Sequence, residues 1–530
     1  MAVPKGGSNV RFPPHPAHYP DAAVPWNDGA GNGNRTRVFS LEGCCTTIVL
    51  YPPDASQRVL ELASLFAGRK RPCTSRVGIN RRDKPARADD VKMLHALLTI
   101  PRYTAAMESD ASLAAHTSAD PRPRSAVSHG AGLAGLIGVL AWIAVARHFG
   151  MDGPYAALVN VAACGLPMVI WSLLVDKVHR SPSTGIDWSA GKPWRETLDL
   201  SLTKLAGLWA TWAAIAVIYG AGRFYWQGNF AFAMWCFTNA APVVFVVSIP
   251  YVLWIDRYLV EPRDGAWHLG AWLTGQAGAD REAIYGHGRA WGVKTFFLAF
   301  MLAIVPPGFG DFVRGDAASV LRDPVALASW LVTLMFLIDV AFATVGYVLT
   351  FRPLDSHIRS ANPYAAAWMP ALMCYPPFIL MNTGGPLDYH PGTSDWAYWF
   401  QGHPILLAMI GAVLVGLTAI YAWATMAFGF RFSNLTNRGI LTHGPYAISR
   451  HPAYLSKNIF WWISTIPVLT LGSVVDAARA TLLMAAVSGV YYWRAKTEER
   501  HLKLDPDYRA YFDWMTRNGL VPRLFAKLRG

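Results

Sequence analysis

Blocks of about 20 consecutive apolar residues dominate the chain after residue 125, and polar loops separate them. A helix of about 20 residues crosses a hydrocarbon core about 30 Å thick, so each block is a candidate membrane span. We predict about ten spans and therefore an all-α, polytopic transmembrane fold. The predicted spans are 127–146, 154–175, 202–221, 230–254, 291–306, 325–350, 364–381, 404–427, 454–471 and 477–493.

Lysine and arginine are unevenly distributed between the loops on the two sides of these spans. If the N-terminus is cytoplasmic, the inner loops and the C-terminal tail carry 25 Lys and Arg, and the outer loops carry five. Positive residues are retained on the cytoplasmic side, so this bias predicts that both ends of the chain are cytoplasmic. The polar loop from Asn382 to Gln401 contains neither residue type and is expected outside.

Residues 1–125 show no sustained apolar periodicity and contain proline pairs and short basic runs. They also lack the apolar core and the small-residue cleavage site of a signal peptide. We expect this segment to be a disordered extension. The alternative is that residues 1–106 are not translated, because Met107 precedes the first span and would serve as a start codon.

The composition supports the membrane assignment and excludes several classes of protein. Of the 530 residues, 53% are hydrophobic and 15% are charged, whereas soluble domains are about a quarter charged. The net charge of +13 is scattered over short loops and the two ends, which argues against nucleic-acid binding. The chain contains 35 Arg but only 12 Lys, which favours a GC-rich bacterial genome and hence a bacterial inner membrane. The six cysteines form no CxxC pair and no Cys/His cluster, so we predict neither disulfides nor a metal site.

The densest group of polar residues on the predicted inner side lies near the C-terminus. One cluster contains Gly444-Pro445-Tyr446 followed by Arg450-His451-Pro452-Ala453-Tyr454, and the other is Arg494-x3-Glu498-Glu499. The ninth and tenth spans separate the two clusters and form a helical hairpin. Both clusters are therefore expected at the same membrane face.

The residue types in these clusters suit a charged cofactor. Arg494 and Glu498 are four residues apart on one helix face, and His501 lies two turns beyond Arg494. A carboxylate, a guanidinium and the rings of Tyr446 and Tyr454 could bind a zwitterionic, adenine-bearing molecule. An ordinary ion pair at a helix end, contributing about 0.3–0.5 kcal/mol, is the alternative. The residues alone leave both interpretations open.

The order and spacing of these motifs resemble the isoprenylcysteine carboxyl methyltransferase family. The resemblance covers about residues 405–525 and extends to Leu502, Tyr508, Tyr511 and Pro522. It implies a membrane methyltransferase that uses S-adenosylmethionine and has no Rossmann sheet. We accordingly expect an extension at 1–125, a transmembrane domain of unknown role at 126–400 and a methyltransferase domain at 401–530.

The resemblance also implies roles for individual residues. Arg494 is expected near the acceptor and the reaction centre, as the catalytic residue. Family members often have histidine at the position of Arg438, so this residue departs from the family pattern. The implied acceptor is a lipid, an isoprenoid or a small thiol, carboxylate or amine. The implied cofactor-binding residues are Arg438, Gly439, Ile440, Leu441, Tyr446, His451, Pro452, Tyr454 and Glu498.

Two other functions stay open. Membrane sterol reductases share a related C-terminal architecture and bind a nicotinamide cofactor, but Ala453 stands where they usually have asparagine. A transporter or scaffold would account for the first seven spans, for the mid-span Asp339 and for a cation site at Asp388 and His390. These acids could equally form structural hydrogen bonds, and the first seven spans could recruit substrate or mediate oligomerisation.

One glycine motif has a simpler interpretation than cofactor binding. Gly130-x-Gly132-x2-Gly135 has the spacing of a dinucleotide-binding loop, but it opens the first span and no strand precedes it. Small residues at such spacing let two helices approach closely in a membrane. We therefore expect the motif to serve helix packing.

Overall fold

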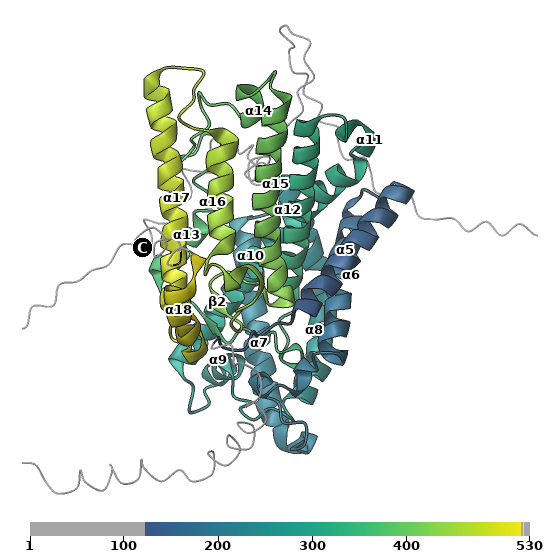
Figure 1. Cartoon of the computed structure of the whole chain (residues 1–530). Coiled ribbons are helices and arrows are strands. Elements are labelled where there is room, and N and C mark those ends of the chain that lie inside the picture. Colours follow the sequence, from purple (N-terminus) through teal and green to yellow (C-terminus); the bar gives the residue numbers. More distant parts are fainter. Residues whose placement is uncertain (1–121, 521–522, 524–530) are drawn as a thin grey trace, which may run out of the picture. The chain divides into compact units, whose positions relative to one another are not determined.

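The computed structural model describes residues 122–520 and Arg523, so the predictions for residues 1–121 lie outside the described part of the chain. Helices account for most of the described residues. The only strands among them are β1 (Ser360–Ala361) and β2 (Thr436–Asn437), which pair antiparallel. The predicted all-α fold is confirmed (Figure 1).

Eight helices in the described part of the chain are long and apolar enough to cross a membrane. Proline opens several of them, and caps such as Asp323 before α12 and Ser473 before α17 accept from the first free N–H groups. The eight are α5 (His129–Phe149), α6 (Pro154–Leu174), α7 (Trp194–Gly222), α8 (Ala231–Ile255), α10 (Arg281–Arg314), α12 (Pro324–Val348), α15 (Pro404–Ala427) and α17 (Val474–Leu502).

Two of the ten predicted spans are not continuous helices. The seventh predicted span, 364–381, contains only α13 (Ala365–Leu372), and Pro376 and Pro377 beyond it lack the N–H groups that a continued helix needs. The ninth, 454–471, contains α16 (Pro452–Thr465). This helix ends where Ile466 adopts a left-handed backbone with φ 46° and Pro467 follows.

After each of the short helices α13 and α16, the chain continues without helix to the opposite end of the molecule. Together, α13 and the segment after it lead from the end where β1 and β2 pair to α14 (Trp396–Trp399) at the opposite end (Figure 1). The segment after α16 reaches the same place, because Leu471 N–H and the Thr470 hydroxyl donate to the Gly392 carbonyl at 2.8 and 2.7 Å. The described chain therefore passes between the two ends ten times, and eight of these passes are uninterrupted helices.

Shorter elements connect the long helices at their ends. They are η1 (Val178–Arg180), η2 (Pro182–Thr184), η3 (Gly228–Phe230), α9 (Gly265–Leu273), α11 (Ala317–Val320), η4 (Arg352–Leu354), η5 (Gly429–Arg431), η6 (Gly444–Ala447) and α18 (Pro506–Asn518).

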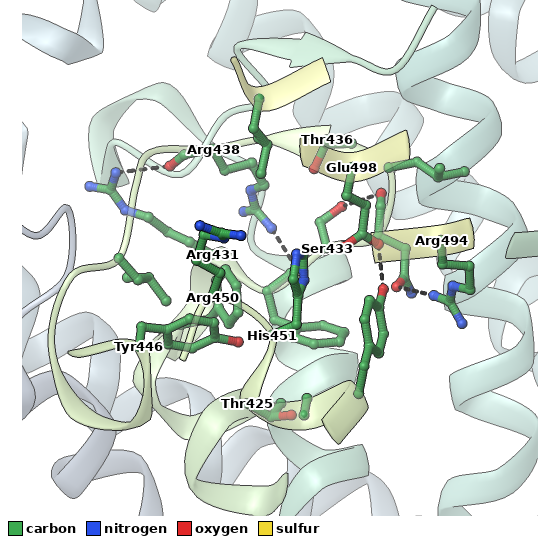
Figure 2. A pocket seen from close by; sticks show the side chains of 18 of the residues that line it. Thr425, Arg431, Ser433, Thr436, Arg438, Tyr446, Arg450, His451, Arg494 and Glu498 are labelled. Atoms are coloured by element: carbon green, nitrogen blue, oxygen red, sulfur yellow. Dashed lines mark hydrogen bonds between the residues drawn. The ribbon is translucent and has the colours of Figure 1, made fainter. Parts of the chain in front are cut away.

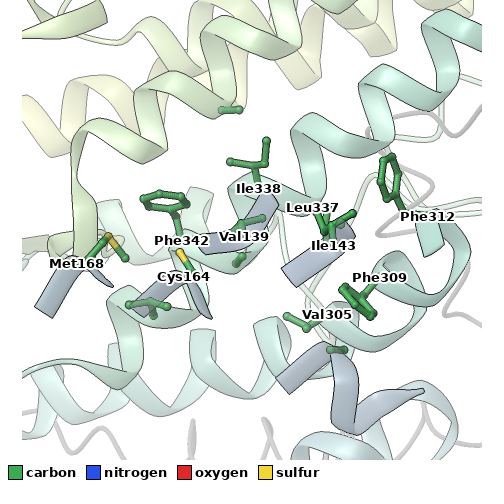
Figure 3. Packing of buried hydrophobic residues seen from close by; sticks show 14 of the residues in the cluster. Val139, Ile143, Cys164, Met168, Val305, Phe309, Phe312, Leu337, Ile338 and Phe342 are labelled. Atoms are coloured by element: carbon green, nitrogen blue, oxygen red, sulfur yellow. The ribbon is translucent and has the colours of Figure 1, made fainter. Parts of the chain in front are cut away.

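A continuous apolar core joins the first helices to the central ones. Phe309 of α10 and Phe342 of α12 pack with Val139, Ile143 and Cys164 of α5 and α6 (Figure 3). All five side chains are at most 5% exposed. Cys164 thus lies in the core as a small apolar residue.

Glycines allow α5 to approach its neighbours closely. A Cβ at Gly132 would lie 2.7 Å from the Met426 carbonyl oxygen, and one at Gly135 would lie 2.8 Å from the Met168 side chain. Neither position has room for a larger residue. The motif Gly130-x-Gly132-x2-Gly135 therefore serves helix packing, as predicted.

The last helix positions the loop between α15 and α16. The Tyr511 hydroxyl of α18 donates to the Tyr446 carbonyl at 2.7 Å. Just beyond α18, Leu520 N–H donates to the Ile448 carbonyl at 3.0 Å. The loop is thereby fixed between α18 and the ends of the long helices.

Candidate functional site

A cavity opens at the end of the helices where the loop between α15 and α16 faces α17 (Figure 2). It contains about 1220 Å³ of empty space, counted together with its open mouth. Pro452 is buried as the first residue of α16 and does not line the cavity. The other predicted site residues all line it, namely Arg438, Gly439, Ile440, Leu441, Tyr446, His451, Tyr454, Arg494 and Glu498.

Ion pairs at Glu499 join the two polar motifs. One oxygen of this carboxylate accepts from Arg450 Nε at 3.0 Å and lies 3.2 Å from His451 Nε2. The other oxygen accepts from the Lys496 ammonium at 3.0 Å. Glu499 is 4% exposed, so these contacts connect the start of α16 to the last turns of α17 in a largely dry environment.

The Arg494 guanidinium is 3% exposed and faces three tyrosine rings. Its carbon lies 5.7 Å from the ring centroid of Tyr375, 5.1 Å from that of Tyr454 and 5.4 Å from that of Tyr491. One terminal nitrogen donates to Asn434 at 3.1 Å, whereas Nε has no hydrogen-bond partner. No carboxylate of the described residues forms an ion pair with this side chain. Because a buried cation without a counter-charge is costly, the site favours an anionic ligand group.

Glu498 lies one turn beyond Arg494 and is half-buried at the cavity wall. The Tyr454 hydroxyl donates to its carboxylate. The Tyr454 ring is stacked in turn on the His451 ring, with centroids 5.7 Å apart and an angle of 9° between the rings. Tyr454 therefore holds the Glu498 carboxylate at the cavity wall.

The Arg438 guanidinium forms hydrogen bonds with backbone carbonyls and leaves no donor free toward the cavity. Its five N–H groups donate to the carbonyls of Gly346, Leu349, Ser356 and Phe432, and the bonds to the first two measure 2.7 and 2.8 Å. A guanidinium has five donors in total, so none remains for a ligand. Arg438 lines the cavity, but its side chain stabilises the C-terminal end of α12 and the chain beyond it.

The loop residues after Arg438 form a turn that requires glycine. Gly439 has φ 104°, and a Cβ at this position would lie 2.6 Å from that of Ala126. Ile440 and Leu441 follow and are buried. They supply the apolar part of the cavity wall near the loop.

Tyr446 lies in η6 and packs edge-on against Phe428 of the preceding loop, with ring centroids 5.3 Å apart. Burial raises the pKa of the Tyr446 phenol well above its usual value, and the neighbouring Tyr511 and Glu498 add to the shift. The phenol therefore stays neutral and can only stack or form hydrogen bonds.

Several lining residues were not anticipated from the sequence. Tyr375 comes from the irregular chain after α13, whereas His501, which the helix spacing had placed near Arg494, shares a 3.0 Å hydrogen bond with Ser360 of β1. An aromatic residue near a span end is typical of the membrane interface, so the sequence carried no signal that singled these tyrosines out. The other unanticipated lining residues include Tyr421, Asn434, Lys457 and Tyr491.

The two acids that suggested a transporter form structural hydrogen bonds. The Asp339 carboxylate accepts from the Thr425 hydroxyl at 2.5 Å and so links α12 to α15. Asp388 accepts from the backbone N–H of Gly384 and from that of His390, whose ring lies 2.9 Å away. Both arrangements are those of satisfied buried polar groups.

Comparison with known proteins assigns the C-terminal region to a family. Residues 404–504 match the model of the isoprenylcysteine carboxyl methyltransferase (ICMT) family. This region runs from the start of α15 to just past α17 and contains both polar motifs. No curated protein and no solved structure matches the chain. The match supports a membrane methyltransferase in general and concerns about a fifth of the sequence.

Proposed function

We propose that this chain is an integral membrane methyltransferase that uses S-adenosylmethionine and methylates a lipid-like, isoprenoid or small thiol, carboxyl or amine acceptor. The observation that carries the proposal is Arg494, a buried guanidinium that faces the cavity with an unsatisfied Nε and no acidic partner among the described residues. Glu498 offers the opposite charge one turn away. The family match of residues 404–504 supports methyl transfer as the reaction class.

The chemistry of the lining residues fits S-adenosylmethionine. The Glu498 carboxylate can accept hydrogen bonds from an ammonium group, and the Tyr446 and Tyr454 rings offer flat apolar faces to an adenine. The buried side chains of Ile440 and Leu441 add an apolar part to the same wall, which suits the apolar portion of an acceptor.

The protein's part in the reaction is positioning and electrostatics. When bound, S-adenosylmethionine supplies an electrophilic methyl group on a sulfonium. Arg494 orients the acceptor through charge, and Glu498 fixes the ammonium end of the cofactor. The rings of Tyr375, Tyr454 and Tyr491 surround the guanidinium, which excludes water and strengthens its interaction with an anion.

Titration of the purified full-length protein with S-adenosylmethionine and with NADPH tests the proposal. We expect the wild type to bind S-adenosylmethionine and Glu498→Ala to bind it at least tenfold more weakly, because the variant loses the carboxylate that faces the ammonium. Arg494→Ala is expected to retain most cofactor affinity and to lose methyl transfer. Glu196→Ala removes an exposed carboxylate on α7 and serves as the matched control.

The same titration separates the alternatives. Absence of S-adenosylmethionine binding by the wild type would refute the methyltransferase proposal. NADPH binding that is lost in Glu498→Ala and Arg494→Ala would instead support the reductase. If neither cofactor binds, a transporter or scaffold becomes the better explanation.

A further inference from the structure

The cavity wall carries more positive charge than the residues around it neutralise. Among the described residues, lysine and arginine contribute five side chains to the lining, and Glu498 is its only carboxylate. Arg450 pairs with Glu499, Arg431 pairs with Asp355 at 2.8 Å, and Arg438 is bound to backbone carbonyls. Two of the five cations, Arg494 and Lys457, have no carboxylate partner in the described part of the chain.

Lys457 lies in the second turn of α16 and is half-buried. Its ammonium lies 5.7 Å from the ring centroid of Tyr421, 5.0 Å from that of Trp461 and 5.5 Å from that of Tyr491. No hydrogen bond or ion pair of this ammonium occurs among residues 122–520. An ammonium group has three donors and is strongly hydrated, so an aromatic environment alone leaves its hydrogen-bonding capacity unused.

Both unpaired cations line the cavity and share one aromatic neighbour. Both lie against Tyr491, at 5.4 Å for the Arg494 guanidinium and 5.5 Å for the Lys457 ammonium. They are therefore separated by no more than the sum of these distances. A small anionic head group with two charges can span such a gap.

Asp339 on α12 attracts Lys457 electrostatically but is not its direct partner. Its carboxylate accepts from Thr425, and both Thr425 and Tyr421 line the cavity. No ion pair joins Asp339 to Lys457 in the described structure. Lys457 therefore has no hydrogen-bonded counter-ion among the described residues.

We propose that the acceptor is an amphiphile whose head carries two anionic groups: a carboxylate that Arg494 orients for methylation, and a second anion that Lys457 binds. This inference rests on the proposed function. Tyrosine and tryptophan rings around both cations suit an apolar tail next to the charged head. Lys457 is therefore assigned as the residue that determines specificity for the second charge.

Methyl transfer to a carboxylate requires no base from the protein. A carboxylate oxygen of the acceptor forms a bond to the methyl carbon, the bond between that carbon and the sulfonium sulfur breaks, and its electron pair stays on sulfur. The products are a methyl ester and a neutral thioether, and no proton is released. Because the ester has one negative charge fewer, Arg494 loses its counter-ion and the product is bound more weakly than the acceptor.

Binding of two matched probes tests the inference. The full-length protein in nanodiscs is titrated calorimetrically with 2-octylsuccinate, which has two carboxylates, and with decanoate, which has one. We expect 2-octylsuccinate to bind at least tenfold more tightly. Lys457→Met should abolish this preference and leave S-adenosylmethionine affinity within about twofold, whereas Lys457→Arg should keep most of the preference. Lys192→Met, which removes an exposed lysine in a loop, controls for the loss of positive charge.

Three results would overturn the inference. Equal affinity of the wild type for the two probes would exclude a second anion site. An unchanged preference in Lys457→Met would show that another group binds the second charge. A loss of S-adenosylmethionine affinity in Lys457→Met would assign the lysine to the cofactor carboxylate. Failure of the wild type to bind S-adenosylmethionine counts against the proposed function instead, since the probe comparison does not need the cofactor.

Discussion

The adjacent residues Glu498 and Glu499 of α17 differ in what their carboxylates contact. Glu499 points away from the cavity and bonds to Arg450, His451 and Lys496, whereas Glu498 lines the cavity beside Tyr454. In the sequence both are acids at the end of a long apolar helix. Only the hairpin, which brings Arg450 and His451 to one side of α17, distinguishes them.

Arg438 is the residue where sequence and structure differ most. The family resemblance implies cofactor binding, but the guanidinium donates all of its N–H groups to backbone carbonyls. The partners Gly346, Leu349 and Ser356 lie more than 80 positions earlier in the chain. Because carbonyls are present at every residue, no side-chain pattern could have identified them.

We therefore predict that Arg438→Lys destabilises the protein. An ammonium has three donors, so at least one buried carbonyl loses its partner, and each unsatisfied group costs about 1–3 kcal/mol. The expected result is a clear drop in thermal unfolding temperature in detergent. Arg509→Lys, at an exposed position of α18, should change stability by less than about 0.5 kcal/mol. Normal stability of Arg438→Lys together with weak cofactor binding would instead support the role implied by the resemblance.

At the scale of elements, the segment ahead of α5 crosses the loop of the candidate site. We call residues Arg122–Ser128 the strap. Ala126 N–H donates to the Ile440 carbonyl at 2.8 Å, and Arg122 donates to the Thr442 carbonyl at 2.9 Å. The Arg122 guanidinium also lies 5.0 Å from the ring of Trp514 on α18.

Side chains of the loop contact the strap in return. The Thr442 hydroxyl donates to the Pro123 carbonyl at 2.9 Å, and His443 Nε2 donates to the Val127 carbonyl at 2.8 Å. Burial lowers the pKa of His443, and the nearby His129 and Arg122 lower it further. The strap thus binds a loop that supplies four of the predicted cofactor-binding residues, Arg438 to Leu441.

Because the strap holds this loop in place, we predict that a substitution in the strap changes cofactor affinity although the strap lies outside the cavity. Arg122→Ala loses one hydrogen bond of about 1 kcal/mol and a cation–π contact of about 0.5–1 kcal/mol, so the loop is less well ordered. We expect S-adenosylmethionine to bind about threefold to tenfold more weakly. Arg124→Ala is the matched control, because Arg124 lies two residues away and is exposed. Equal effects of the two substitutions would contradict a positioning role for the strap.

The sequence was most informative where a pattern depends on neighbouring residues. The apolar periodicity identified the long helices, and the four-residue spacing of Arg494 and Glu498 placed both at one cavity. It was least informative for the chain around Tyr375, where apolar residues continue past two prolines and resemble a span. Whether such a segment forms a helix depends on partners for its free backbone groups, which are distant in sequence.

At the scale of the whole molecule, helices outside the family match help to build the cavity. The Tyr347 hydroxyl of α12 accepts from the side-chain amide of Asn434 at 2.8 Å, and Asn434 in turn accepts from Arg494. Tyr375 provides one of the three rings around the guanidinium. Thus α12 and the chain after α13 support the surroundings of Arg494.

The orientation of the molecule follows from its charges and can be tested directly. The cavity lies at the same end as the η2 loop, because Ser183 donates to Asp355 and Asp355 pairs with Arg431. Lysine and arginine are concentrated at this end, so we expect it to be cytoplasmic. Single cysteines at the exposed positions Ala190, near the η2 loop, and Gln401, at the opposite end, are the probes.

We predict that a membrane-impermeant maleimide labels Gln401→Cys on intact cells and labels Ala190→Cys only after permeabilisation. The background is a variant in which all six native cysteines are serine. A maleimide that does not cross the bilayer reacts from outside only, so the order of labelling gives the sidedness of the cavity. The reverse order would place the cavity outside. It would then have to obtain S-adenosylmethionine from the extracytoplasmic side, and methyl transfer from a cytoplasmic cofactor pool would be ruled out.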